Sequence, residues 1–169
     1  MERLEIILID IKKSKLDTLI FDDLKINPSQ AVRSHFYNHT INEDVAFKQI
    51  DSLQNLMTPS GTGNVLLQEL KLGAIIKDVM MVFSFNPVYG DIILNFPEEE
   101  LFSGDKKTLR NKVKKIIESL IEMKNKYGIS KVRIGIEPAA DDDTCLFELE
   151  ETVQNNTLEE LVDKLLYQP

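Results

Sequence analysis

The stretch from Val79 to Phe96 reads VMMVFSFNPVYGDIILNF. Large apolar side chains occupy alternate positions before and after a central group of turn residues, Asn86 to Asp91. Alternation with a period of two is typical of a strand that buries one face. Asn, Pro, Gly and Asp between two such runs indicate a chain reversal. The stretch therefore predicts a β-hairpin with one buried face, and a sheet around which the rest of the chain must pack.

A long amphipathic helix is predicted directly after this hairpin, over residues 105–127. Its apolar residues recur every three or four positions, which places them on one face of a helix; they are Leu109, Val113, Ile116, Leu120, Met123 and Tyr127. Asp105 or Ser103 can begin the helix, and Gly128 can end it. Two further strands are expected at 131–137 and 144–150. A closing helix is expected after Thr157, where Glu160 completes a capping-box pattern.

The first half of the chain has a different pattern. Residues 4–11 predict a strand, and helices are expected at 28–38, from Asn42 to Met57, and at 65–76, with Thr58–Asn64 as a loop. The whole chain, 1–169, is then one α+β domain, helix-rich over 1–78 and arranged as hairpin, long helix and hairpin over 79–169. We expect a mainly antiparallel sheet of about five strands with helices packed on one face.

Length and cysteine content narrow the protein class. The chain has 169 residues and one cysteine, Cys145, which fits one domain and excludes an internal disulfide framework. The N-terminal apolar run is short and is interrupted by Asp10, so it lacks the pattern of a secretory signal. No apolar run approaches the roughly 18 residues of a transmembrane helix. A cytoplasmic protein without membrane contact is expected.

Negative charge is concentrated near the C-terminus. The chain carries 20 Lys and Arg against 28 Asp and Glu, a formal charge of −8. The stretch from Gly135 to Asp163 contains no Lys or Arg and ten acidic residues: Glu137, Asp141, Asp142, Asp143, Glu148, Glu150, Glu151, Glu159, Glu160 and Asp163. An acidic chain is poorly suited to nucleic acid. The acidic stretch is either a solvated surface or a docking surface for a basic partner.

No metal site is predicted. His35 and His39 lie four residues apart, but the glutamate of a zinc-protease motif is missing between them. Asp141 to Asp143, taken with Glu137, lack the alternate spacing of a calcium loop.

No catalytic or cofactor-binding residues are predicted either. The loop Gly61–Asn64 lacks the lysine of a phosphate-binding loop and a strand before it, and no nucleophile elbow is present. The protein is therefore expected not to be an enzyme. The alternative is a small enzyme or small-ligand-binding domain with a site near Gly61–Asn64. Self-association through residues 144–150 is disfavoured by the carboxylates of that strand.

Two motifs resemble a known protein class. They are FNPVYGDI at residues 85–92 and RIGIEPA at residues 133–139. The chain is similar, over roughly residues 79–150, to the small acidic α+β immunity proteins of bacterial polymorphic and contact-dependent toxins. This resemblance implies a cytoplasmic protein that binds one cognate toxin domain and blocks it.

The sequence thus predicts a non-enzymatic immunity protein that neutralises a cognate toxin through an acidic surface. The partner is a protein, of which a basic toxin domain is one example. The expected partner-binding residues are Glu137, Asp141, Asp142, Asp143, Glu148 and Glu150, together with Tyr89. An exposed aromatic residue, Tyr89 or Phe102, would serve as the anchor. Strand order and oligomeric state stay open.

Overall fold

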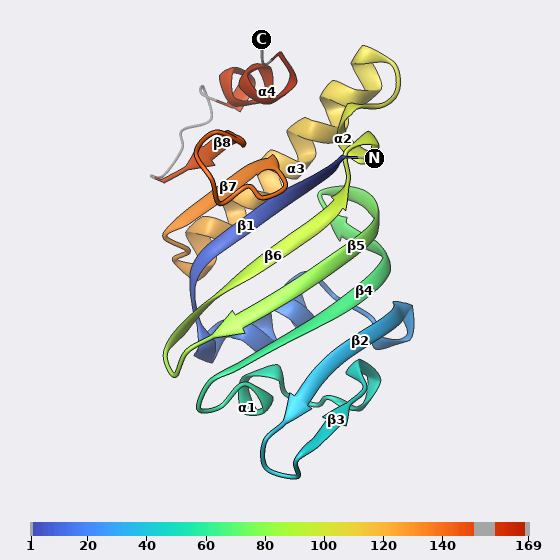
Figure 1. Ribbon diagram of the computed structural model, residues 1–169. Helices are drawn as coiled ribbons and strands as arrows, with labels where there is room; N and C mark the ends of the chain where they lie inside the picture. The colour runs from blue at the N-terminus through green and yellow to red at the C-terminus, as the bar shows by residue number, and fades with distance from the viewer. Residues whose placement is uncertain (1, 151–157, 168–169) are drawn as a thin grey trace.

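The computed structural model describes residues 2–150 and 158–167. In this part of the chain one open sheet of eight strands runs in the order β3-β2-β4-β5-β6-β1-β7-β8 (Figure 1). All neighbouring strands are antiparallel. The bounds are β1 Arg3–Lys12, β2 Ala31–Asn38, β3 Glu43–Val45, β4 Gly61–Leu72, β5 Ala74–Phe85, β6 Tyr89–Pro97, β7 Lys131–Ile136 and β8 Cys145–Leu149. The α+β prediction is confirmed, but the sheet has eight strands rather than about five.

The long helix α3 lies behind the sheet in the view of Figure 1, as do the short helical turns that follow β1. The smaller helices join this layer: α1 contacts the turn after β1, and α2 and α4 both pack on α3. The bounds are α1 Leu53–Leu56, α2 Glu99–Phe102, α3 Lys106–Tyr127 and α4 Leu158–Leu166, with short helical turns η1 Lys13–Lys15, η2 Thr18–Asp23, η3 Pro28–Gln30 and η4 Phe47–Gln49.

A row of apolar side chains crosses the sheet beneath these helices. Strand pairing sets one residue from each of six adjacent strands side by side, and none is more than 1% exposed; in strand order they are Val65, Met81, Leu94, Ile6, Ile134 and Phe147. From the other side, α3 contributes Val113, Ile116, Ile117 and Leu120 to the same core. The row and the helix stripe together form the centre of the core.

The opposite face of the sheet has no helix over it in the described part of the chain (Figure 1). Because side chains alternate along a strand, the residues next to the buried row point to this open face. Pairing aligns them as well: His35, Asn64, Val82, Ile93, Ile7, Arg133 and Glu148. The centre of this second row is apolar and its ends are polar.

The predictions for the second half of the chain are confirmed. The hairpin forms as β5 and β6, and α3 begins and ends as expected: the Asp105 side chain accepts a hydrogen bond from the backbone N–H of Thr108, and Gly128 adopts a left-handed φ of 63°. β7, β8 and α4 form at the predicted places. The predicted cap Thr157 lies outside the described residues.

The prediction of a helix-rich first half is wrong, and the loop predicted at 58–64 is confirmed over 58–60 but wrong over 61–64. Residues 28–38 make one helical turn, η3, and then the strand β2, while residues 65–76 form the end of β4, the turn at Gly73 and the start of β5. Between Asn42 and Met57 only the short elements β3, η4 and α1 form. Gly61–Asn64 begins β4 rather than ending a loop. Packing explains why residue 63 is a glycine, because a Cβ at this position would lie 2.2 Å from the Phe36 ring.

Gly73 lies in the turn between β4 and β5, where this hairpin packs closely against α3. Its φ is 69°, and a Cβ there would lie 2.1 Å from the backbone oxygen of Lys115 on α3. Gly128 has nearly the same φ, 63°, with no atom within 4 Å of an added Cβ. We expect Gly128→Ala to lower the free energy of unfolding by about 1 kcal/mol, from backbone strain alone.

Gly73→Ala carries the same strain and must also displace the hairpin from α3. It should therefore cost about 1–3 kcal/mol more than Gly128→Ala. Urea unfolding of the two variants and the parent protein measures the difference. Equal losses would contradict the close approach of hairpin and helix.

Candidate functional site

The connection between β7 and β8, residues 137–144, holds four of the seven predicted partner-binding residues. We call it the acidic turn. Its shape is fixed from within, because the backbone oxygen of Asp141 accepts hydrogen bonds from the N–H groups of Thr144 and Cys145. The Thr144 hydroxyl donates to the backbone oxygen of Pro138 at 2.5 Å. The carboxylates of the acidic turn are thus presented on an ordered backbone.

Buried polar side chains attach the acidic turn to the open face of the sheet. The carboxylate of Glu5 on β1, only 9% exposed, accepts a hydrogen bond of 2.9 Å from the backbone N–H of Ala139. Its other oxygen accepts from the Asn95 side chain at 3.3 Å. Arg3 in turn donates to the Asn95 side-chain oxygen and to the Asn95 backbone oxygen. Sequence reasoning missed these residues; the signal is a polar residue within an apolar strand.

Three of the predicted acidic residues form ion pairs with two basic residues of β7. Arg133 on β7 pairs with Asp142 at 3.0 Å and with Glu148 at 3.3 Å. Lys131 pairs with Glu148 at 3.4 Å and with Glu150 at 2.9 Å. The hydrogen bond to Glu150 raises the pKa of Lys131, and the hydrogen bond from Lys131 lowers the pKa of Glu150. Asp142, Glu148 and Glu150 therefore share two cations, and the group keeps one net negative charge.

The other three acidic residues of the prediction have no such partner. Glu137, Asp141 and Asp143 are exposed, and none of their side chains forms an ion pair with another described residue. They stand on one ordered turn, so their charges add in the solvent around it. This group is the uncompensated part of the predicted surface.

Tyr89 does not lie with the acidic turn. It pairs with Lys12 at the end of β1, whereas the backbone N–H of Glu137 donates to Arg3 at the start of β1. The nine residue steps between them span about 30 Å along an extended strand. Tyr89 is 39% exposed, but it belongs to the opposite end of the sheet.

Part of the remaining acidic stretch attaches α4 to α3. Arg110 pairs with Glu159 and Asp163, each at 2.5 Å, and Lys114 pairs with Glu159 at 2.9 Å. Hydrogen bonds to these two carboxylates raise the pKa of Arg110, and those from Lys114 and Arg110 lower the pKa of Glu159. Two basic residues of α3 and two acidic residues of α4 are thus partners within the chain. Glu151 lies outside the described residues.

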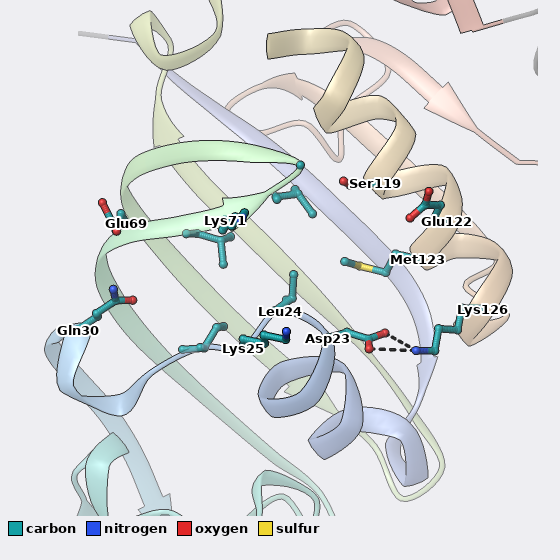
Figure 2. A pocket seen from close by; sticks show the side chains of 14 residues that line it. Asp23, Leu24, Lys25, Gln30, Glu69, Lys71, Ser119, Glu122, Met123 and Lys126 are labelled. Atoms are coloured by element: carbon teal, nitrogen blue, oxygen red, sulfur yellow. Dashed lines mark hydrogen bonds and ion pairs between the residues drawn. The ribbon is translucent and has the colours of Figure 1, made fainter. Parts of the chain in front are cut away.

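A cleft of about 620 Å³ opens on the helix side of the molecule (Figure 2). It lies between the end of η2, the β4–β5 turn and α3. Its lining carries three acidic and three basic side chains: Asp23, Glu69, Glu122, Lys25, Lys71 and Lys126. Figure 2 shows Asp23 and Lys126 joined across one end of the cleft, at 2.8 Å. With charges of both signs, the cleft does not select one type of ionic ligand.

The cleft of Figure 2 does not lie at the alternative site near Gly61–Asn64. These residues form the start of β4, while the cleft of Figure 2 is lined by the other end of that strand, Glu69 to Leu72. Among the described residues, no three His, Cys, Asp or Glu side chains gather in a way that could hold a metal ion. No helix in the described part of the chain is long and apolar enough to cross a membrane.

Comparisons with known proteins give two matches. A family model described as PABL017 Cdi1I immunity protein matches residues 2–152. A chain in the crystal structure of the toxic C-terminal tip of CdiA from Pseudomonas aeruginosa in complex with immune protein has a similar structure, with a TM-score of 0.60 and 16% sequence identity. The match covers 91% of this chain and 97% of that chain; at this identity it shows a shared fold. No curated protein matches the chain.

The ion pair at the cleft makes stability depend on pH in a defined direction. Hydrogen bonds from Lys126 and Tyr127 lower the pKa of Asp23 below its ordinary value. A lowered carboxyl pKa stabilises the fold above the unfolded-state pKa of about 4, and this contribution is lost as the pH falls through the lower folded-state pKa. We expect Asp23→Asn to be less stable than the parent protein near neutral pH, with a difference that shrinks on acidification.

Chemical unfolding across an acidic pH series measures this difference. Asp22→Asn is the matched control, because it removes the adjacent carboxylate, which forms no ion pair with another described residue. A loss of stability in Asp23→Asn that stays constant down to the lowest pH would contradict the assignment.

Proposed function

This chain belongs to the family of the PABL017 Cdi1I immunity protein, and on that premise we propose that the acidic turn is the part of the surface that attracts its toxin. The chain is a non-enzymatic immunity protein that binds and neutralises a cognate bacterial toxin, as the sequence predicts. We propose further that the toxin is the C-terminal tip of a CdiA protein and that binding takes place in the cytoplasm.

One observation supports the acidic turn above the rest of the acidic stretch. Its three uncompensated carboxylates, Glu137, Asp141 and Asp143, have no internal cation among the described residues, whereas Asp142, Glu148 and Glu150 do. A paired carboxylate must give up its own cation before it can bind another. An unpaired carboxylate on an ordered turn meets a cationic partner without that cost.

This arrangement implies a division among the seven predicted residues. The free carboxylates steer a cationic toxin surface toward the turn. Asp142, Glu148 and Glu150 pair with Lys131 and Arg133 and thereby stabilise the β7–β8 hairpin, which presents the free carboxylates. Tyr89, about 30 Å away along β1, can contribute only if the toxin covers the length of the sheet.

Reversing the free charges tests the proposal. We expect the double variant Asp141→Lys/Asp143→Lys to associate with the purified cognate CdiA toxin tip about tenfold more slowly, because rim charges act mainly on the association rate. Its association rate should also depend less on salt. Stopped-flow association at low and high salt measures both effects.

Asp51→Lys is the control, since it reverses an exposed acidic residue far from the acidic turn. Co-production of toxin and variant in growing cells reports neutralisation separately from docking kinetics. Association of the double variant at the parent rate would contradict the acidic turn as a steering surface. Failure of the parent protein to bind or protect would contradict the choice of toxin.

A further inference from the structure

The open face of the sheet carries an apolar patch that no described helix covers. Pairing brings together Leu66 on β4, Met80 and Val82 on β5, Ile93 on β6 and Ile7 on β1. We call these five residues the open-face patch. Ile7 is 5% exposed, and the other four are half-buried. No described helix covers them, so they shield one another and leave apolar surface in contact with water (Figure 1).

Charged and polar side chains border the patch on both sides, toward β7 and toward β2. Toward β7, the next residue in the row is Arg133, paired with Asp142 and Glu148. Toward β2, the row passes through Asn64 to His35, which lies 3.6 Å from Asp44. An apolar centre, depleted of charge and enclosed by a polar rim, is the composition of a protein–protein interface. Four adjacent strands give the patch a width of about 15 Å.

The patch and the acidic turn form one continuous surface. Glu5 and Asn95 lie on the open face next to the patch, in register with Met80. The Ala139 N–H of the acidic turn donates to that Glu5 carboxylate. The turn therefore borders the patch, and a body that lies on the patch meets the free carboxylates at its edge.

We propose that the open-face patch is the centre of the toxin-binding interface, and that the toxin covers it with an apolar surface bordered by cationic groups. This inference rests on the proposed function and deepens it. The uncompensated carboxylates at the border of the patch favour a cationic partner over a second copy of this chain. If two copies paired through their open faces, each copy would present the same surface to the other. The uncompensated carboxylates at the two borders would then add like charges to the interface.

The parent protein provides a direct readout through Met80. Met80 is the one described methionine that is not buried; Met57, Met81 and Met123 are 1%, 0% and 8% exposed. Oxidation by peroxide converts an accessible methionine to the sulfoxide. Among the described methionines of the free chain, we expect Met80 to be oxidised first. Its oxidation should slow at least about tenfold in the complex with the cognate CdiA toxin tip, because a desolvated interface excludes the oxidant.

A substitution at the patch gives a second readout. Val82→Lys places a charge at the apolar centre and should weaken toxin binding on the order of a hundredfold, mainly through faster dissociation. Ile75→Lys is the matched control: it is the same kind of change on the same strand, at an exposed position by the β4–β5 turn. Thermal unfolding of both variants shows that the fold is kept, and Val82→Ala serves if Val82→Lys does not fold.

The outcomes separate the inference from the proposed function. Protection of Met80 together with selective loss of binding in the Val82 variant supports the open-face patch. A stable complex in which Met80 is oxidised at the free rate and Val82→Lys binds normally overturns the patch but leaves the proposed function intact. Absence of any complex overturns both. Protection of Met80 in the free chain, growing with its concentration, assigns the face to a second copy and also overturns the proposal.

Discussion

The row of side chains from Val65 to Phe147 beneath α3 is the contact on which the rest of the molecule depends. Six antiparallel strands place one apolar residue each in this row, and α3 covers it with Val113, Ile116, Ile117 and Leu120. Side chains alternate between the two faces of a strand, so the residues that face the core also determine which residues face the other side. The packing of α3 therefore determines which residues form the open face, and through Glu5 it also determines where the acidic turn lies.

The same periodicity explains how far the sequence predicts this fold. Residues 79–96 and 105–127 keep one period throughout and are predicted correctly. β4 does not: its buried aliphatic side chains are Val65, Leu67, Leu70 and Leu72, so the period slips by one residue at Gln68 and Glu69. Opposite the slip, Asp78 takes a positive φ of 53°. In the sequence alone, apolar residues spaced by two, three and two positions resemble the apolar face of a helix. Only the pairing of β4 with β5, which is a tertiary contact, shows that these residues form a strand.

The candidate site shows the same limit in its charges. The acidic stretch is visible in the sequence, but the partners of its carboxylates are not, because they lie on β7 and α3. Arg133 faces Glu148 across the β7–β8 pair, and the alternation of Lys131 and Arg133 against Glu148 and Glu150 is a signal that two strands of opposite charge would pair. Once these ion pairs are assigned, the predicted partner-binding carboxylates without an ion pair to a described residue are Glu137, Asp141 and Asp143, all on one turn. The pairing of strands, rather than the number of acidic residues, thus defines the electrostatic surface.

Steering and affinity place different demands on such a surface. Exposed ion pairs contribute about 1 kcal/mol or less each, because water and salt screen them. Three carboxylates on the acidic turn can accelerate encounter, yet they cannot by themselves hold a toxin long enough to keep it inactive. Long residence requires apolar surface that water leaves on binding. Among the surfaces described, the open-face patch is apolar, continuous with the acidic turn and free of covering helices. In the interface that we propose, the turn and the patch are complementary: the turn governs how fast the toxin arrives, and the patch governs how slowly it leaves.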